Sequence, residues 1–190
     1  MDIIYPQSHL LQPILLFGQF LDKINSLSSR KSIKEEISQG QPSNLQFHVM
    51  IVDDDPDDQE LLAEAFSEAS AQVKISLAMN GKELFALLQM VGAEKPDLII
   101  IDLNMPGING FECLAAIKGN PLIKDIPIVI YSTSANQEQI DFTHKNGASC
   151  YIQKPNSFSD IKKIAAKILS IPIITFLEKR PREEFVLRPD

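Results

Sequence analysis

Apolar runs alternate with amphipathic stretches between residues 46 and 170. The runs are short, rich in β-branched residues and bounded by turn residues, which predicts buried strands. In the stretches between them apolar residues recur at three- and four-residue spacing, which predicts helices. The expected strands are 47–52, 73–78, 97–101, 126–131 and 148–153. We expect a first helix that begins at Asp55 and Pro56 and a second that begins after Asn80 and Gly81. Two more are expected at 111–118 and 137–145, and an apolar stripe from Ile161 to Leu169 predicts a fifth.

This alternation predicts an α/β fold. We expect a doubly wound, flavodoxin-like domain with a five-stranded parallel sheet, strand order 2-1-3-4-5, and five helices on its two faces. The unbroken run DLIII at 97–101 is typical of a parallel strand that is covered on both sides. In such sheets ligands bind beyond the carboxyl ends of the strands, at the switch between strands 1 and 3. The residues that follow the expected strands are therefore the candidates for chemistry.

The two ends of the chain lack this pattern. Residues 1–45 show no clear apolar face and are interrupted by proline and glycine, so we expect a poorly ordered extension that ends in a linker at 38–44. Residues 171–190 form a C-terminal tail that starts with the apolar sequence IPIITFL. This part could pack on the domain, add to a dimer contact or form a short strand, and the sequence does not decide among these. The predicted domain itself spans 46–170.

Charge narrows the range of partners. The 190 residues carry a formal net charge of −7, which argues against direct binding to nucleic acid. The excess lies entirely in residues 46–170, where 17 acidic residues face 10 basic ones. A site in this region that gathers carboxylates would favour a cation.

No segment suggests a membrane span or a signal peptide. The apolar residues 10–20 contain Pro13 and Gly18 and are much shorter than the roughly 20 residues that a spanning helix needs. No lysine or arginine precedes them, as a signal peptide would require. We therefore expect a cytoplasmic protein that does not bind membranes. The two cysteines, Cys113 and Cys150, are expected to be buried thiols in a reducing compartment.

Carboxylates follow two strands that should be neighbours in the sheet. Asp53 and Asp54 come directly after the first strand, and Asp102 comes directly after the third. Like charges brought together raise one another's pKa values, and a divalent cation relieves this. Oxygen ligands without histidine or cysteine favour Mg²⁺. For the remaining acidic residues of the run, Asp55, Asp57 and Asp58, we prefer a solvated turn or helix cap.

Asp102 opens the segment DLNMPGING at 102–110. A polar residue after four apolar ones at a strand end is a candidate nucleophile. Asn104 can offer its backbone carbonyl to a metal, and the proline and glycines that follow predict a tight loop into the next helix. Ser132 and Lys154 close the fourth and fifth strands. A hydroxyl and an ammonium group at this edge of the sheet could both reach a phosphoryl group.

These residues together resemble the receiver domain of two-component response regulators. The resemblance is carried by VDD at 52–54, DLNMPGING at 102–110, Ser132 and YIQKP at 151–155. It covers about residues 46–170, and it is specific because four separated elements recur in the same order and spacing. The sequences DDDPDDQELLAEAF and GASCYIQKP are further similar to the single-domain receivers associated with bacteriophytochrome-type kinases.

The resemblance implies a phosphorelay protein that accepts a phosphoryl group on Asp102 from a histidine kinase or a histidine phosphotransfer protein. Its cofactor would be Mg²⁺, bound directly by Asp54, Asp102 and the carbonyl of Asn104, with Asp53 acting through water. Lys154 would pair with a phosphoryl oxygen. Such a protein is not an enzyme with a separate substrate, because it catalyses only its own phosphoryl transfer and dephosphorylation.

The resemblance also implies a switch. Ser132 would bond a second phosphoryl oxygen and move on activation, and the aromatic Tyr151 would respond to it. The surface of the fourth helix, fifth strand and fifth helix would then change for a downstream protein target that the sequence does not name. A homodimer through this face is a further option. The Lys154–Pro155 bond is expected to be cis.

Two positions depart from the family pattern. Ser132 stands where threonine is common; it keeps the hydroxyl, so we expect the switch to survive. Thr133 stands where alanine is common, and a bulkier neighbour can restrict access to the site. The lifetime of the phosphoryl group is therefore left open.

Three alternative functions compete with this interpretation. A pseudo-receiver would use the same surface without phosphorylation, but the full set of site residues argues against it. An aspartyl-phosphate phosphatase needs a second aspartate two residues after the nucleophile, where this chain has Asn104. A DNA-binding regulator would need an output domain, and the remaining segments are too short and too neutral for one.

Overall fold

The computed structural model describes residues 46–90, 92 and 94–189. A single parallel sheet runs through these residues, with strand order β2-β1-β3-β4-β5-β6. Its strands are β1 Phe47–Val52, β2 Val73–Ala78, β3 Leu98–Ile101, β4 Ile128–Ser132, β5 Cys150–Gln153 and β6 Val186–Leu187. The doubly wound order that the sequence predicts is confirmed for β1 to β5. The predicted extension at 1–45 lies outside the described residues.

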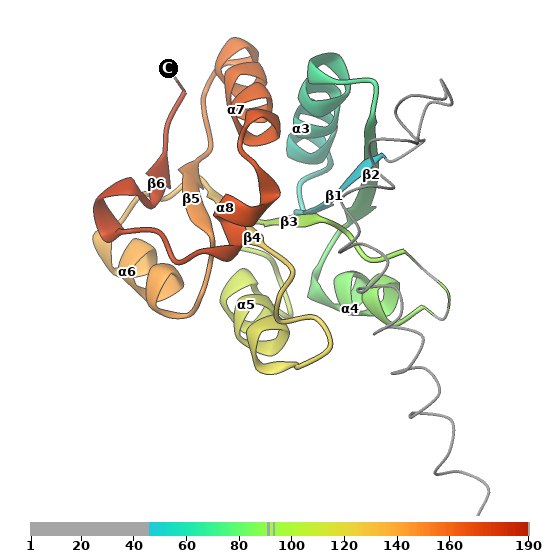
Figure 1. Cartoon of the computed structure of the whole chain (residues 1–190), viewed down its shortest axis with the longest axis vertical. Coiled ribbons are helices and arrows are strands. Elements are labelled where there is room, and N and C mark those ends of the chain that lie inside the picture. The colour runs from blue at the N-terminus through green and yellow to red at the C-terminus, as the bar shows by residue number, and fades with distance from the viewer. Residues whose placement is uncertain (1–45, 91, 93, 190) are drawn as a thin grey trace, which may run out of the picture. The chain divides into compact units, whose positions relative to one another are not determined.

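Helices cover both faces of the sheet (Figure 1). They are α3 Pro56–Ala69, α4 Gly81–Gln89, α5 Gly110–Gly119, α6 Gln137–Lys145, α7 Phe158–Ser170 and the short α8 Ile173–Leu177, with a 3-10 turn η1 at Arg182–Glu184. Leu62 and Phe66 of α3 pack with Ile164 of α7 on one face. Leu84 of α4 and Leu114 of α5 pack on the other face. The sheet is thus buried on both sides, as its continuous apolar strands require.

Side-chain caps fix where the helices begin, and with them the loops that follow the strands. Asp55 is the N-cap of α3 and accepts a hydrogen bond from the Asp57 N–H, with Pro56 at the first helical position. Asn80, Asn109 and Asn136 cap α4, α5 and α6, and each side chain accepts a hydrogen bond from the N–H three residues further on. The cap interpretation of Asp55 is confirmed.

The sheet has six strands instead of the five predicted. Val186 and Leu187 pair in parallel with Tyr151 and Ile152 of β5. Two residues are too few to show a period, so the sequence pattern could not reveal this strand. The fully buried Phe185 directly precedes it.

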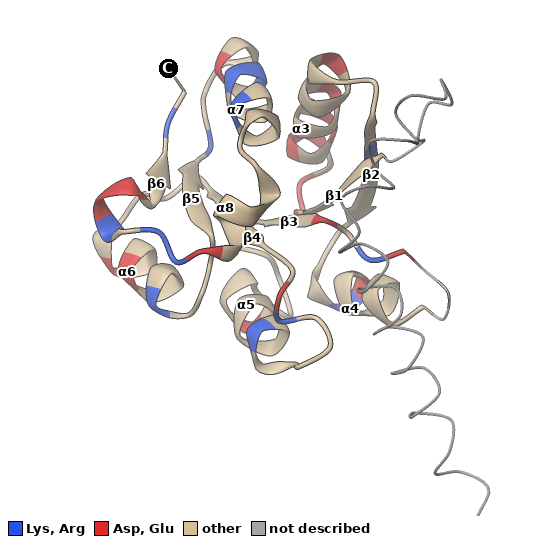
Figure 2. Cartoon of the chain, viewed as in Figure 1, with Lys and Arg blue, Asp and Glu red and all other residues tan. Residues whose placement is uncertain are grey.

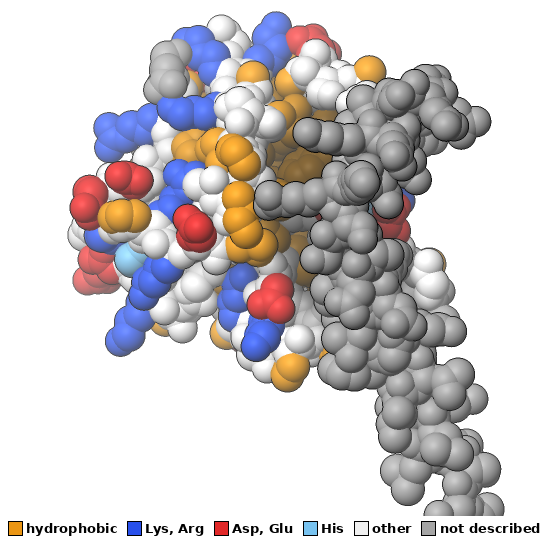
Figure 3. Space-filling view, in the orientation of Figure 1, with side chains coloured by type: hydrophobic (Ala, Val, Ile, Leu, Met, Phe, Trp, Pro, Cys, Tyr) orange, Lys and Arg blue, Asp and Glu red, His pale blue; other side chains and the backbone are white. Residues whose placement is uncertain are grey.

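The apolar start of the tail packs on the domain, the first of the three options that the sequence left open. It forms α8, in which Phe176 is buried. Ile174 and Leu177 of α8 remain 60% and 51% exposed. Figure 3 shows hydrophobic side chains in orange on the surface of the face that is turned to the viewer. Both cysteines, Cys113 and Cys150, are buried and free.

Candidate functional site

The ends of β1 and β3 bring two buried aspartates together. The Asp53 N–H donates to the Ala78 carbonyl at 3.1 Å, and the Asp102 N–H donates to the Val52 carbonyl at 2.9 Å. Each aspartate therefore continues the hydrogen bonding of the sheet by one residue beyond its strand. Both side chains are buried. With Asp54 they offer carboxylate oxygens that all lie within 4.8 Å of one another.

Lys154 reaches this cluster from the end of β5. The backbone N–H of Lys154 donates to the Ser132 carbonyl at 2.9 Å, so hydrogen bonding to β4 fixes the position of its backbone. Its Nζ lies 2.7 Å from Asp53 Oδ2, 2.7 Å from Asp58 Oδ2 and 3.8 Å from Asp102 Oδ2. The ammonium group therefore makes two charge-assisted hydrogen bonds and stands close to a third carboxylate without bonding it.

The prediction of a cis bond between Lys154 and Pro155 is wrong. No cis peptide occurs among the described residues. The trans form is the intrinsically favoured isomer of a bond to proline. With this bond in the trans form, Lys154 bonds both Asp53 and Asp58, so the position of the ammonium group does not require the cis isomer.

Two residues of α3 belong to the site although sequence reasoning assigned them no role there. The sequence favours a solvated turn or helix cap for Asp58, but in the structure its carboxylate pairs with Lys154. Gln59 is buried, and its Nε2 donates to the carbonyls of Asp53 and Ala78, both at 2.8 Å. One signal could have found them. In a doubly wound sheet the helix after strand 1 begins at the ligand edge, so its first turn faces the site.

Burial sets the electrostatics of the cluster. Burial raises the pKa of both Asp53 and Asp102, and the charge of Lys154 opposes this shift. Burial also lowers the pKa of Lys154, but the hydrogen bonds to Asp53 and Asp58 outweigh it and raise this pKa overall. Lys154 is therefore held as a cation. Acidic residues gather on α3 beside this edge (red in Figure 2).

One oxygen of Asp102 is unengaged. Its Oδ1 is buried and has no hydrogen-bond partner among the described residues. A buried carboxylate oxygen without a partner is costly, and such atoms mark places where an ion or a reacting group belongs. Together with the neighbouring carboxylates of Asp53 and Asp54, this donor set fits a divalent cation with oxygen ligands.

A glycine holds the Asp102 loop close to α5. A Cβ atom at Gly110 would lie 2.2 Å from the Asp102 carbonyl oxygen, so no other residue fits without moving the backbone. The Gly110 N–H also donates to the Leu103 carbonyl at 3.1 Å. Gly107 adopts φ of +78°, the left-handed region that favours glycine. The loop predicted from DLNMPGING is thus built to fix Asp102.

The predicted switch residues lie beside the cluster on β4 and β5. Ser132 is fully buried, and Asn104 Nδ2 approaches its Oγ at 3.4 Å. The ring of Tyr151 is buried, and its hydroxyl donates to the Ser134 carbonyl at 2.6 Å. Burial raises the pKa of Tyr151, so the hydroxyl stays protonated as a donor. Thr133 is exposed next to Ser132.

Residues 49–166 match the family described as the response regulator receiver domain. This chain belongs to that family. The receiver domain is similar to the response regulator Rcp1 of Synechocystis, with 31% identity over 126 residues that cover 64% of this chain and 86% of Rcp1. It is also 31% identical to the two-component response regulator ARR17 of Arabidopsis thaliana over 134 residues, 66% of this chain and 86% of ARR17.

Solved structures agree with the fold of this receiver domain. The phosphorylated cyanobacterial phytochrome response regulator RcpA is 33% identical, with a TM-score of 0.61 over 65% of this chain and 91% of RcpA. The Mn²⁺-bound form of Rcp1 is 31% identical, with a TM-score of 0.59 over the same shares of the two chains. The similarity to phytochrome-associated receivers that the sequence indicated is confirmed.

Family membership establishes the general function. The protein carries a receiver domain of two-component signalling, a signalling module that works with histidine kinases. Receiver domains bind a divalent metal at an acidic pocket, and the cluster of Asp53, Asp54 and Asp102 is consistent with one. Within the described part of the chain, no helix is both long and apolar enough to span a membrane.

Proposed function

We propose that Asp102 accepts a phosphoryl group from a histidine kinase or a histidine phosphotransfer protein. The observation that supports this proposal is the environment of the Asp102 carboxylate. Asp102 is buried at a strand end, one of its oxygens has no partner among the described residues, and a cation stands 3.8 Å from the other oxygen. A carboxylate in this position is open to bond formation and is flanked by the positive charge that a phosphoryl group needs.

Mg²⁺ is the cofactor of this proposal. Asp54, Asp102 and the backbone carbonyl of Asn104 would hold it directly, and Asp53 completes the set. When bound, the ion supplies positive charge for the oxygens of the transferring phosphoryl group. The close approach of the three carboxylates supports this assignment.

The chain's own residues position the transfer. An Asp102 oxygen forms the new bond to phosphorus, and the bond from phosphorus to the donor breaks, with its electron pair leaving on the donor. Lys154 lies near enough to pair with an oxygen of the phosphoryl group, because its Nζ is already 3.8 Å from Asp102. Water later hydrolyses the acyl phosphate and returns the aspartate, so the protein turns over only its own phosphoryl group.

The proposed output is a change of surface. Ser132 is drawn to a phosphoryl oxygen, and Tyr151 rearranges beside it, which shifts the population of two states. The affected surface is formed by α6, β5 and α7, and the described C-terminal residues lie against it. The readout would be a cytoplasmic protein partner, without direct contact to nucleic acid or membrane. Homodimerisation through this face stays a prediction.

Intact mass after incubation with acetyl phosphate tests the proposal. With Mg²⁺ present we expect a gain of about 80 Da, the mass of one phosphoryl group, and no gain in Asp102→Asn. Removal of Mg²⁺ by a chelator should abolish the gain. A folded wild-type protein that gains no mass with acetyl phosphate or with a second small donor would contradict the proposal and favour a pseudo-receiver.

A further inference from the structure

Asp58 sits outside the set of residues that the proposed function uses, yet it bonds the cation of the site. We infer that Asp58 is a positioning residue for Lys154: it holds the ammonium group beside Asp102 without letting it close on the acceptor carboxylate. This inference rests on the proposed phosphorylation of Asp102 and adds a residue to it.

The geometry around the ammonium group supports this role. A lysine ammonium group has three N–H donors. Two of them are engaged at 2.7 Å, one by Asp53 on the β1 side and one by Asp58 on α3. The distance of 3.8 Å to Asp102 Oδ2 is too long for a hydrogen bond. Lys154 is thus bonded to two carboxylates other than the acceptor, with one donor left.

The backbone around Asp58 is fixed, so its carboxylate has a defined direction. Asp58 lies in the first turn of α3, which begins at the Asp55 cap and Pro56. The next residue, Gln59, is buried and bonded to the carbonyls of Asp53 and Ala78. A helix start that is tied to the ends of β1 and β2 carries Asp58 with it. The side chain of Lys154 itself is only 9% exposed.

Without the Asp58 charge, Lys154 would have one strong partner fewer. Among the described residues, the carboxylate that then stands closest to its ammonium group after that of Asp53 is that of Asp102. A long lysine side chain is a mobile point charge, so we expect the ammonium group to move toward Asp102. A direct ion pair there would engage Asp102 Oδ2, and it would use the donor that should meet the phosphoryl group. The transfer to Asp102 would then become slower.

Asp58→Asn tests this, and Asp57→Asn is the matched control. Both substitutions remove one negative charge from the first turn of α3. Asp57 is exposed, and of these two aspartates only Asp58 pairs with Lys154. With acetyl phosphate and saturating Mg²⁺, we expect the initial phosphorylation rate to fall about tenfold in Asp58→Asn and to change less than about twofold in Asp57→Asn. Equal rates in the two variants would overturn the inference.

A second comparison separates positioning from a general structural effect. In a Lys154→Met background the charge that Asp58 positions is gone, so Asp58→Asn should change the remaining rate by less than about twofold. A full tenfold loss in that background would show that Asp58 acts on something other than Lys154, and the inference would fail.

The side-chain ¹⁵N signal of Lys154 provides a test that needs no phosphorylation. In the metal-free protein we expect the same Nζ shift in wild type and Asp57→Asn, and a displaced or broadened signal in Asp58→Asn. An unchanged signal in Asp58→Asn would refute the positioning role. If the wild type gains no phosphoryl group, the proposed function fails, and this signal still decides whether Asp58 holds Lys154.

Discussion

Strand β5 joins two regions of opposite character. At its carboxyl end, Lys154 meets the buried carboxylates of Asp53 and Asp102, a polar cluster that is costly to bury. Along its edge lies the C-terminal strap, which we define as residues 178–189. There Phe185 is fully buried, and its carbonyl accepts a hydrogen bond from the Tyr151 N–H at 2.9 Å. The first region buries the charged groups that we propose for phosphoryl transfer, whereas the second buries an aromatic side chain and contributes no group to the carboxylate cluster.

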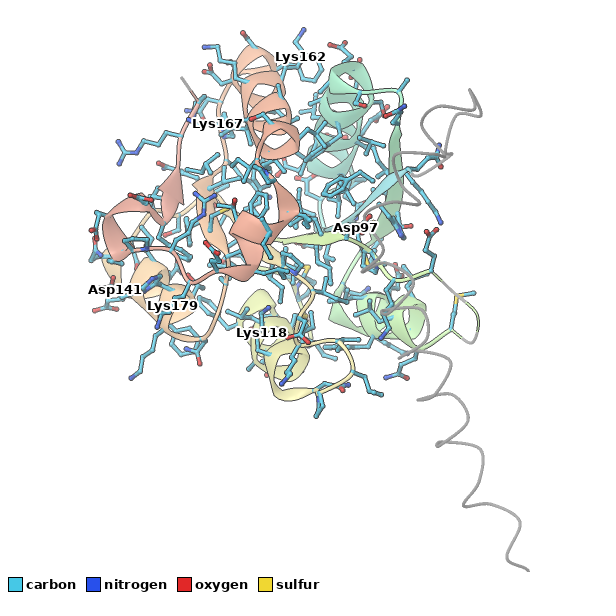
Figure 4. All side chains as sticks on the ribbon, in the orientation of Figure 1. Asp97, Lys118, Asp141, Lys162, Lys167 and Lys179 are labelled. Carbon is cyan, nitrogen blue, oxygen red and sulfur yellow. The ribbon has the colours of Figure 1, made fainter. Side chains whose placement is uncertain are left out.

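The C-terminal strap is attached to both helices that flank β5. His144 Nε2 lies 2.8 Å from the Arg180 carbonyl oxygen, and its ring meets Phe185 edge-on at 4.8 Å. Arg182 pairs with Asp141 on α6, and Lys167 on α7 donates to the Arg188 carbonyl of the strap. Figure 4 labels Asp141 and Lys167 on their helices. The strap therefore lies on the surface that is proposed to change on phosphorylation.

Phe185→Ala tests the strap's side of the comparison and should have the largest effect. Truncation of a fully buried phenylalanine leaves a cavity and removes its apolar contacts, so we expect a loss of about 3–5 kcal/mol in the free energy of unfolding, measured with urea. The folded fraction should still accept a phosphoryl group on Asp102, because the strap contributes no group to the cluster.

Ile174→Ala is the control in the same C-terminal region. Its side chain is 60% exposed, so we expect a change within about 0.5 kcal/mol. If Phe185→Ala were as mild as this control, the strap would not be part of the domain's core. If it abolished phosphorylation of the folded protein, the division between the two regions would be wrong.

Gly110→Ala tests the region around Asp102. It should cost less stability than Phe185→Ala but reduce phosphorylation strongly. The added methyl group would overlap the Asp102 carbonyl, so the loop must move, at about 1–3 kcal/mol in the free energy of unfolding. Displacement of Asp102 should reduce the phosphorylation rate by about 100-fold, read by intact mass.

Gly119→Ala is a matched control at the other end of α5. A methyl group added there would meet no tertiary neighbour within 4 Å among the described residues. Alanine is also the better helix former, so a gain of about 0.5–1 kcal/mol in the free energy of unfolding is expected. Unchanged phosphorylation in a folded Gly110→Ala protein would mean that the tight loop does not position Asp102.

The sequence predicts the site correctly where the position of a residue follows from the end of a strand. The bounds of β1, β2 and α6 match the predicted ones, because apolar periodicity and strong caps mark them. Once the sheet order is known, residues after β1, β3, β4 and β5 must lie at one edge. The sequence could therefore bring Asp53, Asp102 and Lys154 together without a structure.

Features that depend on side-chain packing could not be predicted from the sequence. Asp58 lies in a run of acidic residues, and only the direction of α3 shows that it faces Lys154. The strand in the strap has only two residues and lies within a charged segment, so no hydrophobic periodicity predicts it. Phe185 is buried because it lies beside β5 and the ring of His144, which are distant from it in the sequence.

The smallest expected effect concerns the stability cost of the reactive carboxylate. Burial raises the pKa of Asp102, so the folded protein binds this proton more tightly than the unfolded chain, where the pKa is about 3.9. The carboxyl group's contribution to stability is therefore complete below pH about 4 and is lost as the pH rises through the raised value. Above the raised pKa the metal-free protein holds a buried charge that Asp102→Asn does not, so this variant should be more stable there by about 1 kcal/mol.

Urea unfolding in a chelator between pH 4 and pH 8 measures this difference. The advantage of Asp102→Asn should shrink as the pH falls through the raised pKa, because the wild-type carboxyl group then also becomes neutral. It should reverse at pH 7 when Mg²⁺ is added, because an ion that binds only the native wild type stabilises it. Asp57→Asn, at an exposed position, should show neither trend. A pH-independent advantage would instead assign the gain to packing, and the reactive carboxylate would no longer be the charge that destabilises this edge of the sheet.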